Sequence, residues 1–151
     1  QDRRMIRPLA LVWMGIVIGV SFLATPVKFT ADSLTRPVAL DVGRATFHAL
    51  AYLEWVLAAL LAVLIWRTAT HQQSIGRRAL TAAAVVAVAV VVQSAWLQPE
   101  LDERVASIIA GIEPPPSHLH TVYGIVEVTK VAALGLLAAW ADPQPRRRTV
   151  L

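Results

Sequence analysis

Four long runs of apolar residues constrain the fold of this chain more than any other feature. They cover approximately residues 6–25, 45–66, 79–98 and 121–140, and charged residues, proline or both flank each run. A helix needs about 20 mostly apolar residues to cross about 30 Å of hydrocarbon. Backbone groups in lipid must bond within their own segment, and the runs lack the alternation of barrel strands. The sequence therefore predicts an all-α integral membrane protein, a single domain of four transmembrane helices in a lipid bilayer.

The composition agrees with a membrane protein and excludes several other classes. Of the 151 residues, 56% are hydrophobic and 16% are charged, whereas soluble domains have about 45–50% apolar and about 25% charged residues. The net charge of +4 comes from short basic clusters between apolar runs. These clusters do not form the basic stripe with interleaved aromatics that would indicate a nucleic acid partner. The chain has no cysteine, which excludes disulfides, thiolate metal sites and cysteine nucleophiles.

The first apolar run is either a cleaved signal peptide or a retained span. Three arginines precede it, as in a signal peptide, but the run exceeds the usual length of about 7–15 residues and lacks a small-x-small cleavage site. We expect a retained helix. Met5 is a candidate natural start, which would make Gln1–Arg4 an addition to the natural chain.

Basic residues beside the spans predict the orientation, because Lys and Arg are enriched in cytoplasmic loops. The N-terminus, the second connection and the C-terminal tail together hold nine of them, whereas the first and third connections hold four. The sequence therefore predicts a multi-pass protein of the cell's inner (plasma) membrane with both termini in the cytoplasm. Residues 26–43 and 99–117 would then lie outside.

Both predicted outer connections contain helix signals. Pro37 predicts a helix that begins there and runs straight into the second span. Between Pro99 and Gly111, four apolar residues follow helical spacing, namely Leu101, Val105, Ile108 and Ile109. We expect a short interfacial helix here, between spans 3 and 4, that lies over the bundle as a lid. Ser117 is a candidate cap for the first turn of the fourth span.

Three ionisable residues fall inside predicted spans: Glu54 in the second, and Glu127 and Lys130 in the fourth. Such a residue costs about 2.5–3.5 kcal/mol at the centre of a spanning helix on insertion scales, so it usually faces the bundle interior and often marks function. We therefore expect these three side chains to meet between the two spans.

Helical spacing extends these residues into two polar stripes. His120, Tyr123, Glu127 and Lys130 are separated by three, four and three residues, and Arg44, Phe47, Ala51 and Glu54 repeat that spacing, with His48 beside them. The second and fourth spans run in the same direction, so the stripes can face one another. The candidate ligand-binding residues are therefore Arg44, His48, Glu54, His120, Tyr123, Glu127 and Lys130.

This polar cluster has a structural and a functional interpretation. Glu127 and Lys130 can neutralise each other, with Glu54 and Tyr123 completing a network that fixes helix register. Alternatively the cluster is a site for a ligand, an ion or a proton, because two acids face one base and a buried acid without a full partner tends to stay protonated.

The histidines near the outer face are a second candidate site. His48, His118 and His120 are expected within a turn or two of that face, and imidazole is a common transition-metal ligand. His48 and His120 could also ligate a haem iron. However, His118 and His120 would point in nearly opposite directions on a regular helix, so the signal for a metal is weak.

The remaining polar or small residues in the spans are interpreted as structural. Gly15 and Gly19 form a Gly-x-x-x-Gly pattern that lets a neighbouring helix approach closely, either within the bundle, which we favour, or in a homo-oligomer or larger complex. The third span, rich in Ala and Val with Gln93 and Ser94 as its polar residues, is expected to be packing material.

The order of these features resembles an uncharacterised bacterial family of small four-span membrane proteins, a domain of unknown function. The similarity lies in Gly19–Phe29 (GVSFLATPVKF), in Val42-Gly43-Arg44, and in Pro99–Lys130, where a Leu-Asp-x-Arg helix and a proline run precede His-x-x-Tyr and Glu-x-x-Lys. It covers most of the chain. It implies the fold and carries no activity to transfer.

Two functional classes follow from the sequence. The first is a non-enzymatic membrane protein that binds or transports a small ligand at the intramembrane polar site, or that serves as an accessory subunit of a larger complex. The second is a redox protein that binds haem or a metal through the outer histidines. The sequence contains no nucleophile–base pair, phosphate loop or paired-carboxylate hydrolase pattern, so it disfavours a conventional enzyme.

Overall fold

The computed structural model describes residues 2–71 and 75–141, which are helical apart from short turns and connections. The elements in chain order are α1 (Asp2–Val17), a π-helical segment η1 (Ile18–Ala24), α2 (Thr25–Lys28), α3 (Arg36–Thr70), α4 (Arg77–Val92), a second π-helical segment η2 (Gln93–Leu97), α5 (Gln98–Ile109) and α6 (Leu119–Ala141). They join into four long helices, Asp2–Lys28, Arg36–Thr70, Arg77–Ile109 and Leu119–Ala141, each long and apolar enough to cross a membrane. The predicted all-α, four-span architecture is confirmed.

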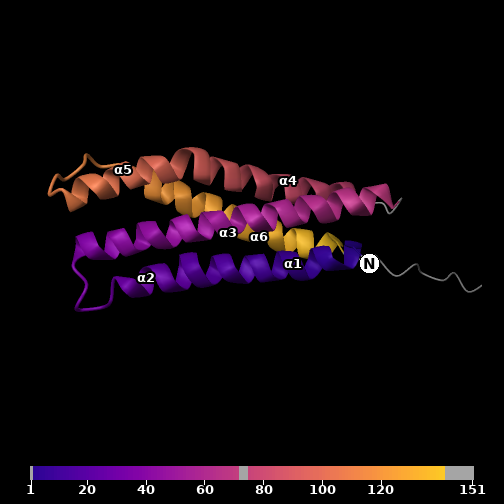
Figure 1. The fold of residues 1–151 in the computed structure, drawn as a ribbon, viewed down its shortest axis with the longest axis horizontal. Helices are drawn as coiled ribbons and strands as arrows, with labels where there is room; N and C mark the ends of the chain where they lie inside the picture. Colours follow the sequence, from indigo (N-terminus) through magenta and orange to yellow (C-terminus); the bar gives the residue numbers. More distant parts are fainter. Residues whose placement is uncertain (1, 72–74, 142–151) are drawn as a thin grey trace, which may run out of the picture.

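The four helices lie side by side in an up-and-down bundle (Figure 1). We call the end that holds the connections at residues 29–35 and 110–118 the distal end, and the opposite end, where α1 begins and α6 ends, the terminal end. α1 packs against α3 and α6, and α4 packs against α6. α3 and α6 both run from the distal to the terminal end, as predicted, so their polar stripes can face each other.

Two of the helices are longer than a bilayer is thick. α3 has 35 residues and the α4–α5 helix has 33, which at 1.5 Å per residue makes each of them about 50 Å long, against about 30 Å of hydrocarbon. The stretch expected as a separate interfacial helix is helical, but α5 continues α4 through η2 without a break. Its position at a membrane surface stays a prediction.

Both π-helical segments end two residues before a proline, and each long helix continues through that proline. η1 precedes Pro26 and η2 precedes Pro99. A proline inside a helix removes one hydrogen bond, and its ring clashes with the carbonyl four residues earlier. Widening the preceding turn relieves this clash, and single π-helical turns of this kind are frequent at functional sites. In η2 the wider turn allows Gln93 and Gln98, five residues apart, both to be buried.

The predicted helix boundaries at the distal end are confirmed. Pro37 occupies the first turn of α3, which continues unbroken into the second span. The Ser117 side chain accepts a hydrogen bond from the Leu119 N–H at 3.3 Å. α5 ends in a Schellman motif, in which Gly111 has φ 79° and the Ile112 N–H donates to the Ser107 carbonyl at 2.9 Å.

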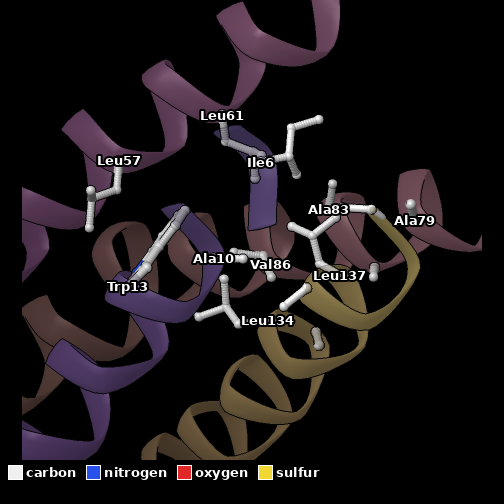
Figure 2. Close-up of a cluster of buried hydrophobic side chains, with 14 of the residues drawn as sticks. Ile6, Ala10, Trp13, Leu57, Leu61, Ala79, Ala83, Val86, Leu134 and Leu137 are labelled. Atoms are coloured by element: carbon white, nitrogen blue, oxygen red, sulfur yellow. The ribbon is translucent and has the colours of Figure 1, made fainter. Parts of the chain in front are cut away.

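The hydrophobic core lies toward the terminal end, where side chains of all four long helices meet (Figure 2). Trp13 of α1 is fully buried at the edge of this cluster, beside Leu57 of α3. Leu134 and Leu137 of α6 fill the space between α1 and α4 near Val86. These contacts hold the helices in register on the terminal side of the polar residues described next.

The preferred interpretation of Gly15 and Gly19 was wrong. A Cβ atom placed on either glycine would meet nothing within 4 Å in the described part of the chain, so neither mediates a close helix contact within the bundle. At Gly135 of α6, a Cβ would lie 3.6 Å from the Met14 Sδ of α1, which is an ordinary van der Waals distance. Pairing of Gly15 and Gly19 with another molecule stays a prediction.

We expect Leu134→Ala to lower the free energy of unfolding by roughly 2–5 kcal/mol, because it leaves a cavity among tightly packed side chains. Leu136→Ala is the matched control, because Leu136 is on the same helix but 45% exposed, whereas Leu134 is fully buried. Reversible unfolding in mixed micelles measures both. Equal losses would contradict the assigned packing face of α6.

Candidate functional site

Lys130 lies at the centre of a buried polar cluster halfway along the bundle, and its side chain is fully buried. Its Nζ lies 2.6 Å and 2.8 Å from the two carboxylate oxygens of Glu54. It also donates to the Gln93 side-chain oxygen at 2.6 Å and, more weakly, to Glu127 Oε1 at 3.3 Å. An ammonium group has three donors, and these acceptors use all of them.

Glu127 has a less complete set of partners than Glu54. Its Oε1 accepts a hydrogen bond from Gln93 Nε2 at 2.9 Å in addition to the long contact with Lys130. Its Oε2 is buried and has no hydrogen-bond partner among the described residues. Tyr123 lies one turn before Glu127 on the same face of α6 and is also buried.

Two members of the cluster were missed by the sequence interpretation. The Trp13 Nε1–H donates to Glu54 Oε1 at 2.9 Å, and Gln93 bridges Lys130 and Glu127. The third span is therefore more than packing material. Gln93 could have been identified as an amide inside a span. Trp13 lies in the interior of its span, but the sequence does not show which residue its indole N–H contacts.

The cluster that we define as Trp13, Glu54, Gln93, Glu127 and Lys130 draws side chains from α1, α3, η2 and α6. The predicted meeting of Glu54, Glu127 and Lys130 is confirmed. Two acids face one base, so one negative charge is left over if all three are ionised. A buried ion without a partner costs several kcal/mol, while an ion pair in good geometry recovers most of that cost.

An aromatic pair connects the cluster to the distal end. The rings of Phe47 and Tyr123 meet edge to face, with centroids 5.3 Å apart and an interplanar angle of 71°. This contact confirms that the two predicted stripes face each other. Tyr123 also lines a pocket of about 320 Å³ between the distal parts of α2, α3, α5 and α6.

The pocket combines apolar walls with basic residues. Phe47, Leu101, Val105 and Ile108 are among its apolar lining residues, and the last three belong to the apolar face of α5. The lid over the bundle stays a prediction. The basic lining residues are Lys28, Arg36, Arg44 and Arg104, and Asp102 is the acidic one. The pocket is therefore an amphipathic site with a surplus of positive charge.

The four basic residues differ in their partners. Arg36 pairs with Glu113 at 3.1 Å, and Arg44 pairs with Asp41 at 2.6 Å. Arg104 donates to the Pro115 carbonyl at 2.6 Å. Among the described residues, Lys28 and Arg104 have no carboxylate partner.

Lys28 reaches the pocket over a glycine of the facing helix. Its Nζ lies 5.0 Å from the centre of the Phe29 ring, and a Cβ on Gly43 would collide with that Nζ. Gln98 lines the same pocket and is 93% buried, yet its Nε2 has no hydrogen-bond partner among the described residues. Within residues 2–71 and 75–141, the Lys28 ammonium group therefore has no anionic partner, and the Gln98 amide has an unused donor.

The predicted site residues at the distal end divide into two groups. Arg44, His120 and Tyr123 line the pocket, whereas His48 binds Asp102 Oδ2 at 2.7 Å through its Nε2. Over residues 2–71 and 75–141, no group of three or more His, Asp or Glu side chains is arranged to hold a metal ion. Metal or haem binding by His48, His118 and His120 stays a prediction.

The family model described as a domain of unknown function, DUF4149, matches residues 9–107. The chain belongs to this family. The match contains Trp13, Glu54 and Gln93 and most of the pocket, and it ends before α6, which carries Tyr123, Glu127 and Lys130. No curated protein and no solved structure matches the chain.

The geometry predicts that Lys130 couples more strongly to Glu54 than to Glu127. Lys130→Met should lower the free energy of unfolding by roughly 3–5 kcal/mol, because it leaves the buried carboxylate of Glu54 without its positive partner. Double-mutant cycles with Glu54→Gln and with Glu127→Gln measure the two couplings. A larger coupling for Glu127 would contradict the distances of 2.6 Å and 3.3 Å to Lys130.

Proposed function

We propose that this protein binds a small ligand with an apolar body and an anionic group. The ligand would lie in the pocket at the distal end, on the distal side of the intramembrane polar cluster. The observation that carries this proposal is the free ammonium group of Lys28 in a pocket with apolar walls. The same binding site would serve a transport protein or an accessory subunit of a membrane complex.

The distribution of basic residues supports an anionic ligand. Lys28, Arg36, Arg44 and Arg104 are the only Lys and Arg of the two distal connections and their flanking helix ends, and all four line the pocket. A cation in a partly water-excluded site attracts an anion more strongly than one in bulk water. A shared anion site would explain why these four basic residues lie on the predicted outer side, where Lys and Arg are otherwise rare.

The apolar lining and the size support a small ligand. A pocket of about 320 Å³ is at the lower end of the range of about 300–1,000 Å³ for small-molecule sites, which are mostly apolar with a few well-placed polar groups. The free Nε2 of Gln98 offers a donor for an ester, amide or carboxylate oxygen of the ligand.

The proposal places the pocket at the outer surface of an inner membrane, with both termini in the cytoplasm. If Arg67 and Arg77 mark one edge of the hydrocarbon, about 20 residues of helix reach the other edge. That edge then falls near Phe47 on α3 and Leu97 on η2, beside the pocket. A ligand could enter from water or from the outer leaflet.

Single-cysteine labelling tests the orientation, because the sequence contains no cysteine that would react in the background. With a membrane-impermeant maleimide applied to intact cells, we expect Ser33→Cys to react and Thr70→Cys to react only after lysis. The opposite pattern would place the pocket on the cytoplasmic side.

Calorimetry of the protein in nanodiscs tests ligand binding, with octanoate as the probe and octanol as its uncharged counterpart. The heat measured with empty nanodiscs is subtracted. We expect octanoate to bind more tightly than octanol, and Lys28→Gln to weaken octanoate binding by about 10- to 100-fold, the loss of one charged hydrogen bond. Arg67→Gln, at the terminal end, is the control. Equal binding of octanoate and octanol would contradict an anion site.

Gly43→Ala provides a second variant that retains every charged group. The added methyl would push the Lys28 ammonium aside, so we expect weaker octanoate binding with unchanged octanol binding. Gly15→Ala is the matched control, because nothing lies within 4 Å of its added methyl. Unchanged octanoate affinity in Gly43→Ala would show that the position of Lys28 is not needed.

A further inference from the structure

The buried cluster contains one more acid than it can neutralise. Lys130 uses its three donors on Glu54, Gln93 and Glu127, as an ammonium group does. Glu54 accepts from Lys130 on both oxygens and from Trp13 on one of them, so its negative charge is fully compensated. A second negative charge in the same fully buried space would have no counterion.

Glu127 is the acid that lacks compensation. Its closest charged donor is Lys130 at 3.3 Å, whereas Lys130 lies 2.6 Å from Glu54. Its Oε2 has no hydrogen-bond partner among the described residues, although the side chain is 98% buried. A neutral carboxylic acid removes the surplus charge at this position without any rearrangement of the cluster.

The described groups around Glu127 point to a route for a proton through Tyr123. Lys130 and Glu54 face it as an ion pair, and Gln93 from η2 and Trp13 from α1 add no titratable group to the cluster. Among the described residues, Tyr123 is the remaining titratable neighbour: it lies one turn from Glu127 on the same face of α6, is buried, and lines the pocket. His120, one turn further along α6, also lines the pocket.

We propose that Glu127 is an intramembrane proton-binding site, which holds a proton on Oε2 and exchanges it with water in the distal pocket through the Tyr123 hydroxyl. In the exchange, the hydroxyl accepts a proton from a pocket hydronium ion and passes its own proton to the Glu127 carboxylate. One water molecule and one carboxylic acid result, and the tyrosine is unchanged. The site shares its entrance with the proposed anion site but does not require that an anion bind there.

Infrared spectroscopy of the purified protein in lipid tests the proton directly. We expect a carboxylic acid C=O band at neutral pH that shifts in D₂O and is absent in Glu127→Gln. Tyr123→Phe should move this band to higher frequency, because the carboxyl loses a polar neighbour. Trp13→Phe is the matched control, because Trp13 donates to Glu54, and it should leave the band in place.

The result that overturns the proton site is the absence of the band, or a band that Trp13→Phe moves as much as Tyr123→Phe does. In both cases Glu127 would be ionised or the proton would belong to Glu54. Neither result depends on octanoate binding, so a failure here is distinguishable from a failure of the anion site.

The route is tested by the rate of deuterium exchange at the same band. A bulky maleimide attached to Val105→Cys fills the pocket and should slow exchange at least several-fold, whereas the same label on Thr70→Cys at the terminal end should not. Exchange that is slowed only by the label at Thr70, or by neither label, overturns the route through the pocket.

Discussion

The ammonium group of Lys130 is the constraint on which the rest of this bundle depends. Because it is fully buried, every nearby helix must supply an acceptor or support one. α3 supplies Glu54, η2 supplies Gln93, and α1 supplies Trp13, which holds the Glu54 carboxylate in place. Within a bilayer, the hydrophobic effect does not drive helices to associate. Polar contacts such as these therefore help to specify which helices pair and at what rotation. The apolar core around Trp13 and Leu134 then fits against a register that the cluster has set.

The cluster and the pocket follow one another along one side of α6. The Phe47–Tyr123 pair separates them, so the pocket can hold water or a ligand while the ion pair below stays dry. The two sites have opposite charge surpluses, since four basic residues and one acid line the pocket, whereas two acids and one base form the cluster. An anion in the pocket would therefore neutralise its basic lining, and a proton on Glu127 would neutralise the cluster below.

Much of this site could be predicted from the spacing of residues along single helices. Glu54, Glu127 and Lys130 are costly in lipid wherever they face it. The spacing of Tyr123, Glu127 and Lys130 places these three on one face of α6. The contributions of Trp13 and Gln93 could not be predicted in this way. Trp13 resembles any apolar residue of a span until its neighbour is known, and the widened turn before Pro99 alters the face on which Gln93 lies.

The sequence by itself determined the four spans, the common direction of α3 and α6, and the presence of surplus acid in the membrane, because hydrophobic length and charge are properties of each segment alone. Only the tertiary structure decided which acid Lys130 holds, and that Lys28, Arg36, Arg44 and Arg104 converge on one pocket. It also decided that neither Gly15 nor Gly19 contacts a neighbouring helix among the described residues. These outcomes depend on helix rotation and on distances between segments far apart in the chain, and helical periodicity within one segment carries no information about either.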